Sequence, residues 1–199
     1  TNLDAPKGKV ISIDINHPEE NNWKVLIDEQ NDVLTNVEIL ENYILCQYLK
    51  NVASEVFLYE KESLKKKTID FNRQGIISNI STNQDSDIFY FSYTNYIQPN
   101  QIYKYNAKNN DISLIWAKEI PQFFSDDYIS QQVFYPTMDG TMIPMFISHH
   151  KDIELGVNTP LLLYGYGGFD ISILPNFRER YLAWMLMGGV VAVPNIRGG

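Results

Sequence analysis

The sequence predicts an all-β region over residues 1–120 that is followed by an open α/β sheet over residues 121–199. Three observations lead to this prediction. Short apolar runs recur about every 8–12 residues through the first region, with turn-forming residues between them. The pattern of these runs repeats once within the region. The second region instead contains a hairpin, a strand, a helical segment and a strand, which is the opening order of an open α/β sheet.

Nine apolar runs in residues 1–120 have the length and composition of β-strands. The chain holds 13 Tyr and 10 Phe, and these aromatic residues favour strands over a helical bundle. Asn, Asp, Ser, Gly or Pro separates one run from the next. The predicted strands are Val10–Ile15, Trp23–Ile27, Val37–Leu40, Tyr43–Leu49, Glu55–Tyr59, Ile76–Ile80, Ile88–Tyr93, Gln101–Tyr105 and Ile112–Ala117.

A weak internal repeat is found when the chain is offset by 45 residues, which places Ile44 on Phe89. In each copy, a strand, a polar turn and another strand are followed by a charged or Asn-rich turn, over Glu60–Lys67 and Ala107–Asp111. A period of about 40–50 residues with four strands per unit is typical of β-propeller blades. Two or three blades cannot close a ring, so a propeller would need more chain upstream. A chance match of alternating strands remains the alternative.

A linker-like stretch over Lys118–Asp127 separates the two regions, because turn-forming and acidic residues gather there. After it, the apolar-rich runs Gln131–Pro136 and Met142–His149 flank Asp139-Gly140. An Asp-Gly pair between two such runs predicts a β-hairpin.

The rest of the second region predicts a strand, a helix and a strand. Leu161–Tyr164 is a continuous apolar run of the kind that is buried on both faces of a sheet. Asn176 is predicted to cap a helix that ends at Gly188-Gly189. Gly189–Ile196 predicts another fully buried strand. The apolar residues of the helix are Phe177, Tyr181, Leu182, Met185 and Leu186.

Composition excludes several classes of protein. The net charge of −8 argues against a nucleic-acid partner. Cys46 is the single cysteine, lies in an apolar run and is expected to be a buried thiol. No metal motif, phosphate-binding loop or dinucleotide fingerprint occurs, so we expect no metal or cofactor. No apolar stretch reaches the ~20 residues that span a bilayer, and no signal segment is recognised, so no membrane partner is expected.

The richest chemical signal is the turn Tyr164–Phe169, which directly follows Leu161–Leu163. A strand that ends in such a turn is where an α/β-hydrolase builds half of its oxyanion hole. Each donor placed at a developing oxyanion contributes about 3–4 kcal/mol. Tyr166, flanked by two glycines, is a candidate donor, and Phe169 is a candidate pocket wall. The alternative is a tight turn whose aromatic side chains only pack.

The catalytic residues that such a turn serves are not recognisable in this chain. No Gly-x-Ser-x-Gly elbow occurs, and the only histidines are His17, His149 and His150. We expect all three at the surface, and they precede the turn, whereas an α/β-hydrolase triad runs in the order Ser, acid, His. The chain starts without Met and stops just after a strong strand, so we expect an internal section of a longer protein that is inactive alone.

Three separate motifs resemble the prolyl oligopeptidase (prolyl endopeptidase) family. They are Phe134–Phe146, Tyr164–Phe169 and Asn195–Gly199, and they agree with the family in order and spacing. Thr1-Asn2-Leu3 and Trp23–Leu26 are also similar to that family. The likeness covers essentially the whole chain, which makes it far more specific than any one motif.

The resemblance implies a fold, an activity and site residues. Residues 1–120 would be the last blades of a seven-bladed β-propeller, and residues 121–199 the start of an α/β-hydrolase domain. The whole protein would be a monomeric, cytoplasmic serine peptidase that cleaves short peptides after proline through an acyl-enzyme. By resemblance, Tyr166 donates its hydroxyl to the oxyanion, Phe169 lines the proline pocket, and the Ser, Asp and His lie beyond Gly199.

The key turn also separates branches of this family. Gly168-Phe169 favours the proline-specific branch, because oligopeptidase B tends to have Ser-Tyr at this place. Asp170 stands where Asn is expected. A different class of function stays open, namely a catalytically inactive propeller-hydrolase protein that acts as a binding or interaction module. A Gly-x-Ser-x-Gly elbow in the downstream sequence would discriminate between the two.

Overall fold

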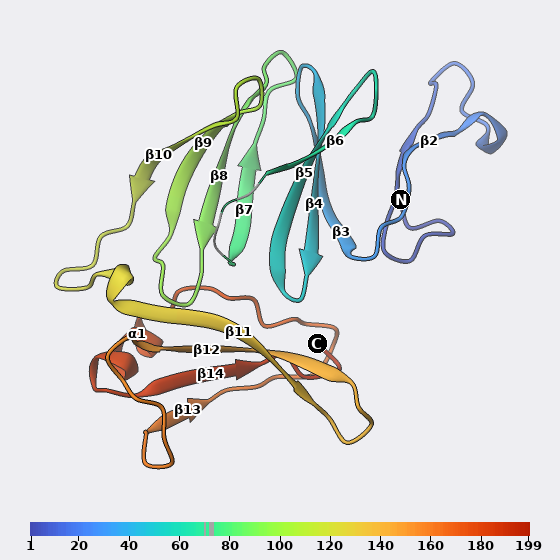
Figure 1. The fold of residues 1–199 in the computed structure, drawn as a ribbon. Helices are drawn as coiled ribbons and strands as arrows, with labels where there is room; N and C mark the ends of the chain where they lie inside the picture. The colour runs from blue at the N-terminus through green and yellow to red at the C-terminus, as the bar shows by residue number, and fades with distance from the viewer. Residues whose placement is uncertain (70, 72–73) are drawn as a thin grey trace.

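Two four-stranded antiparallel sheets stand side by side in residues 33–117, and a third four-stranded sheet with one helix lies against their lower edge (Figure 1). This computed structural model describes residues 1–69, 71 and 74–199. A two-stranded sheet precedes the first four-stranded sheet along the chain. In the N-terminal region the order of the sheets in space follows their order in the sequence, as in stacked structural repeats.

Every neighbouring pair of strands in the N-terminal region is antiparallel. The two-stranded sheet contains β1 (Val10–Ser12) and β2 (Lys24–Ile27), with the 3-10 helix η1 (Glu20–Asn22) between them. The first four-stranded sheet contains, in chain order, β3 (Val33–Ile39), β4 (Tyr43–Lys50), β5 (Ala53–Glu60) and β6 (Lys66–Ile69). The second contains, again in chain order, β7 (Ile76–Ser81), β8 (Ile88–Thr94), β9 (Gln101–Asn106) and β10 (Asp111–Ala117). Each strand predicted in this region is confirmed, with shifted ends.

The internal repeat is confirmed, because each copy is one four-stranded sheet. The offset that places Ile44 on Phe89 carries β4 onto β8, the second strand of each sheet. The sheets pack face to face through a shared apolar core, in which Leu45 and Leu58 of the first sheet meet Phe89 and Phe91 of the second. Successive four-stranded antiparallel sheets are the units from which β-propellers are built.

A buried carboxylate joins equivalent positions of the two copies. Asp87 is only 2% exposed and accepts hydrogen bonds from the backbone N–H of Asn42 at 2.8 Å and from its Nδ2 at 2.6 Å. The offset of 45 residues relates these two positions. Nζ of Lys108 lies 3.6 Å from the same carboxylate. Because a buried charge without partners is costly, these contacts favour one placement of the second sheet on the first.

Strand β6 corrects the prediction that Glu60–Lys67 is a turn. Two lysines begin this strand, and Ile69 at its end is buried and pairs with Val56 of β5. Nζ of Lys66 lies 3.5 Å from the centroid of the Phe57 ring. Lysines are common on edge strands, where they discourage pairing with further chains. Here they also mask the apolar pattern from which strands are predicted.

The other face of the first sheet packs against the two-stranded sheet. Ile44, Cys46 and Tyr48 of β4 share an apolar core there with Ile27 of β2. Cys46 is fully buried, which confirms the prediction for the single thiol. Burial raises the pKa of this thiol to about 12, because a thiolate would lose its hydration there.

The remaining residues form a mixed sheet and one helix. Its elements are η2 (Ser125–Asp127), β11 (Tyr128–Pro136), β12 (Met142–His150), β13 (Leu161–Leu163), α1 (Glu179–Leu186) and β14 (Val190–Pro194). The sheet order is β11-β12-β14-β13, and only the pair β13–β14 is parallel. The predicted hairpin and the order strand, helix, strand are confirmed. In the described residues no helix has the length and apolar character to cross a membrane.

The start of the helix is a correction, because Asn176 does not cap it. Helix α1 begins at Glu179, after an extended Arg178 that makes no side-chain cap bond. The backbone N–H of Phe177 instead donates to Oγ1 of Thr94 at 3.2 Å, so a contact with the second sheet holds this segment extended. Tertiary packing thus overrides the local capping signal.

Strand β13 is less covered than the sequence predicts. Leu162 packs into the core beneath α1, but Leu161 and Leu163 are 55% and 62% exposed. Successive side chains of a strand point to opposite faces, and α1 covers only one face of this sheet. The prediction of burial on both faces is therefore wrong for β13 in this chain. It is confirmed for β14, all five residues of which are buried.

An aromatic side chain from the second sheet anchors the two regions to each other. Tyr96 lies between β8 and β9 and is buried in the core beneath α1. Its ring centroid is 5.4 Å from that of Phe146 and 6.1 Å from that of Tyr181. An ion pair of 2.6 Å between Lys118 and Glu179 adds a surface contact between the regions. The mixed sheet is therefore held by packing against the propeller-like sheets.

Candidate functional site

The glycine-rich turn leaves the mixed sheet at the C-terminal end of β13. The backbone N–H of Tyr164 donates to the carbonyl oxygen of Ala192 at 3.0 Å, which extends the pairing with β14 by one residue. Because β13 and β14 are parallel, residues 165–171 and residues 195–199 emerge at the same edge. Open α/β sheets bind ligands outside the carboxyl ends of their strands. The turn thus occupies a position suited to a ligand.

These two segments pack so closely that two positions require glycine. A Cβ on Gly167 would lie 2.4 Å from the carbonyl oxygen of Arg197 and 2.7 Å from Cγ1 of Ile196. Gly198 has a φ of +91°, and a Cβ there would lie 2.9 Å from the carbonyl oxygen of Gly167. The sequence predicts glycines that let substrate come close. At Gly167 it is another segment of the chain that comes close.

The end of the turn is strained. Phe169 and Asp170 have φ values of 55° and 56°, in the left-handed region. Asp tolerates this region, but for a bulky residue such as Phe it is a genuine outlier. Such residues persist only where the surroundings hold them, and they cluster at ligand-binding and active sites. Here the backbone N–H of Asp170 donates to the carbonyl oxygen of Gly198 at 3.1 Å, which ties the strained residues to the second segment.

The two predicted site residues both lie on this turn. Phe169 is 91% exposed, so the strained backbone presents an apolar ring to solvent. Tyr166 is 38% exposed, and its ring lies over Gly168, where a Cβ would be 3.8 Å from the hydroxyl oxygen. Among the described residues this hydroxyl has no hydrogen-bond partner, so it is available to donate to a ligand. The roles predicted for the two side chains are not tested by this geometry.

Asp139 and Arg197 are a pair that the sequence analysis missed. The Arg197 guanidinium donates through Nη1 to the carboxylate of Asp139, at the tip of the hairpin between β11 and β12. The residues are 58 positions apart. The sequence indicates only that Asp139-Gly140 is a turn, and no local pattern pairs the carboxylate with one of the chain's arginines.

The histidines lie away from the turn, on β12 and in the N-terminal region. The expectation of a surface position is wrong for His149, which is buried with Nδ1 2.8 Å from the carbonyl oxygen of His150. The ring of His150 packs edge-on against Tyr128, with 5.1 Å between centroids. In the part of the chain that is described, no serine hydroxyl is hydrogen-bonded to a histidine, and no group of His, Cys, Asp or Glu could hold a metal ion.

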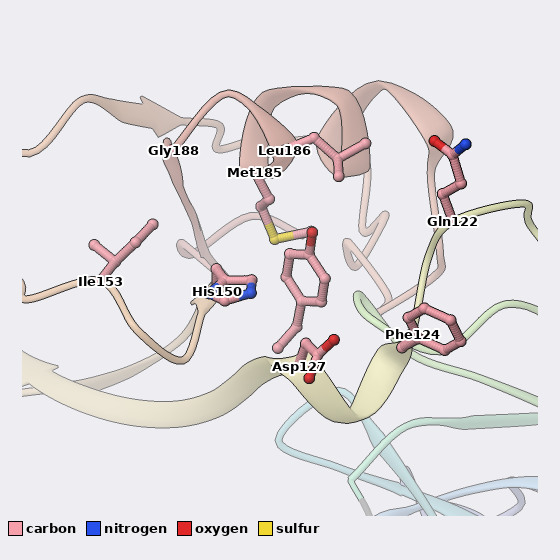
Figure 2. Close-up of a pocket in the computed structure, with 9 residues that line it drawn as sticks. Gln122, Phe124, Asp127, His150, Ile153, Met185, Leu186 and Gly188 are labelled. Atoms are coloured by element: carbon pink, nitrogen blue, oxygen red, sulfur yellow. The ribbon is translucent and has the colours of Figure 1, made fainter.

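A cavity of about 390 Å³ lies beside the C-terminal end of α1 (Figure 2). Figure 2 shows Met185 of α1 on one side of it and Asp127 on the other, with His150 between them. The carboxylate of Asp127 pairs with Nζ of Lys151 at 3.0 Å. No residue of the glycine-rich turn lines this cavity, so it is separate from the candidate site.

Comparison with known proteins gives a consistent result for the whole chain. Residues 1–118 match the family model described as prolyl oligopeptidase, N-terminal β-propeller domain. A prolyl endopeptidase from Elizabethkingia meningoseptica is 36% identical over 199 residues, which are 100% of this chain and 28% of the relative. The chain therefore spans about 28% of the length of this curated relative.

Solved structures agree with the sequence matches. A structure from a structural and mechanistic analysis of two prolyl endopeptidases has a TM-score of 0.87 and 36% identity, and the match covers 100% of this chain and 29% of that one. Prolyl oligopeptidase B from Galerina marginata, bound to a 35mer hydrolysis and macrocyclization substrate, has a TM-score of 0.87 and 32% identity. That match covers 100% of this chain and 28% of the other.

Proposed function

Because the chain belongs to the prolyl oligopeptidase family, we propose that it is part of a longer serine peptidase that cleaves short peptides on the carboxyl side of proline. Relatives named prolyl endopeptidase match over the full length of this chain and support the assignment. The substrate-bound relative supports a peptide as the ligand. Location in the cytoplasm and a monomeric state stay predictions that rest on the family resemblance alone.

We assign residues 1–120 to the last blades of a seven-bladed β-propeller and residues 121–199 to the beginning of an α/β-hydrolase domain. The two stacked four-stranded sheets support the first assignment. The second is supported by the parallel pair β13–β14, the helix between these strands, and the glycine-rich turn at the C-terminal end of β13. In this proposal the catalytic Ser, Asp and His belong to the chain that follows Gly199.

Within the proposed reaction, the turn stabilises the oxyanion and holds the residue before the cleaved bond. The nucleophile attacks the carbonyl carbon, and negative charge develops on the carbonyl oxygen. The Tyr166 hydroxyl donates a hydrogen bond to that oxygen, an interaction that strengthens as the charge grows. The ring of Phe169 packs against the proline side chain, whose compact apolar ring suits a wall of this kind.

The single observation that carries this proposal is the strained turn that holds Phe169 in a left-handed conformation with its ring exposed. Strained residues of this kind cluster at ligand-binding and active sites, so a role of this turn in binding a ligand is the better explanation.

The test is an activity assay of the full-length protein that contains this chain. Short peptides with an internal proline are compared with the same peptides in which alanine replaces the proline. We expect cleavage after proline and little after alanine. A full-length protein with its serine elbow intact that leaves the proline peptides uncut would refute the proposal. An elbow without serine would favour the inactive binding module.

A further inference from the structure

The geometry points to Asp139 as a positioning residue for the glycine-rich turn, acting through an ion pair with Arg197. This inference rests on the proposed function and assigns it a further residue. We infer that the hairpin tip between β11 and β12 fixes the position of residues 195–199, and that these residues fix the positions of Tyr166 and Phe169. The chain that carries the oxyanion donor is thereby fixed from outside the turn.

The hairpin tip is built to hold a charged carboxylate in one orientation. Oδ1 of Asp139 accepts hydrogen bonds from the hydroxyl of Thr137 and from the backbone N–H of Thr141, the latter at 3.1 Å. The Thr137 hydroxyl, followed by the Arg197 guanidinium and Thr141, holds the pKa of Asp139 well below its usual range. The carboxylate therefore stays charged over the pH range in which peptidases are assayed. Its second oxygen, Oδ2, remains for Arg197.

Arg197 lies on the segment that touches the turn most closely. Its carbonyl oxygen is the atom that a Cβ on Gly167 would meet at 2.4 Å. The next residue, Gly198, accepts the hydrogen bond from the strained Asp170 at 3.1 Å. Fixing the side chain of Arg197 therefore restricts the two backbone groups against which the turn rests.

The other end of the segment is fixed by polar contacts of its own. The backbone N–H of Asn195 donates to the carbonyl oxygen of Pro144 in β12 at 2.9 Å. Nδ2 of Asn195 donates to the carbonyl oxygen of Ile173 at 2.7 Å. In the described residues, Asp139 supplies the side-chain contact of Arg197, two positions further along. Besides this ion pair, the side chain of Ile196 and backbone contacts join the segment to the turn within the described residues.

The first experiment measures kinetics in the full-length protein, with Asp139→Asn, Arg197→Gln and the double variant. We expect kcat on a proline peptide to fall about three- to tenfold, with KM little changed. This loss is larger than the effect of an ordinary exposed ion pair and smaller than the about 10²-fold loss of rate caused by a ~1 Å misplacement of a catalytic group. The double variant should be no worse than either single variant, because both remove one interaction. Arg197→Lys, which keeps the charge, should recover part of the rate.

The matched control is Glu55→Gln, which removes another exposed ion pair. Nζ of Lys50 and Oε1 of Glu55 lie 3.0 Å apart, far along the chain from the turn. This variant should leave kcat and KM unchanged. A loss of rate in the control equal to that of Asp139→Asn would overturn the inference, because any exposed pair would then have the same effect.

The second experiment does not depend on activity. Hydrogen–deuterium exchange of the peptide that covers residues 164–171 should be faster in Asp139→Asn than in the parent, because the N–H of Asp170 is protected through Gly198. Unchanged exchange would overturn the inference, even if kcat falls. If the parent protein proves inactive, the proposed function fails, and this exchange measurement alone decides whether the ion pair holds the turn.

Discussion

Replacement of Gly167 by alanine is expected to lower kcat of the full-length enzyme on the order of 10²-fold, because the new methyl group would separate two segments of the site. A Cβ at this position would lie 2.4 Å from the carbonyl oxygen of Arg197, whereas ordinary contact begins at 3.4 Å. The segments would therefore move apart by about 1 Å, and a displacement of ~1 Å of a positioned group costs about that factor in rate.

The displacement also has an energetic cost in the folded state. The colliding atoms include the backbone oxygen of Arg197, which cannot rotate away as the end of a long side chain can. Forcing extra atoms into a tight contact typically costs about 1–3 kcal/mol. The variant should therefore melt at a lower temperature than the parent, as well as turn over more slowly. Steady-state kinetics on a proline peptide and a thermal melt measure the two effects.

A neighbouring glycine provides the contrast that tests this reasoning. A Cβ on Gly168 would meet only the ring and hydroxyl of Tyr166, both at 3.8 Å, which is ordinary contact. Gly168→Ala should therefore lose much less activity than Gly167→Ala. Gly156→Ala, where a Cβ would meet nothing within 4 Å, should behave as the parent. Equal kcat for Gly167→Ala and the parent would refute the close contact between the two segments.

Three further predictions concern Tyr166, Cys46 and Asp87. Tyr166→Phe should lower kcat on the order of 10²-fold or less with KM retained, and steady-state kinetics showing a large rise in KM alone would make Tyr166 a binding residue instead. The raised pKa of Cys46 keeps its thiol neutral, so iodoacetamide at pH 8 should modify it only in denaturant, as read by mass spectrometry. The contribution of the neutral thiol to the free energy of unfolding is fully present below pH 9 and declines as the pH rises towards 12. Asp87→Ala should lower the free energy of unfolding by about 2–3 kcal/mol in urea melts, because the two donors of Asn42 lose their charged acceptor.

Local patterns were sufficient for most strands, because alternate burial leaves a period-2 signature in the sequence. They failed at β6, where Lys66 and Lys67 occupy an edge strand that reads as a charged turn. They failed also at Asn176, whose capping signal is overridden by the contact between Phe177 and Thr94. In both cases the deciding interaction comes from a different strand or a different sheet, which no single window of sequence contains.

The candidate site, too, could be predicted only where its residues belong to one local motif. Tyr166 and Phe169 could be singled out because both belong to one short motif after one apolar run. The left-handed backbone of Phe169 could not be predicted from the sequence, because local preference argues against that conformation for Phe. The ion pair of Asp139 with Arg197 joins residues 58 positions apart and leaves no local signature either.

The strain at Phe169 explains why the glycine-rich motif alone is weak evidence of function. A bulky residue stays left-handed only where neighbouring structure holds it, and here that structure is the segment Asn195–Gly199. Gly167 must be glycine because this segment passes against it, and Gly198 must be glycine for the reciprocal reason. A sequence with Tyr164–Phe169 but without the second segment would lack the means to hold the turn. The two motifs are thus one physical unit, and their joint occurrence carries information that neither has alone.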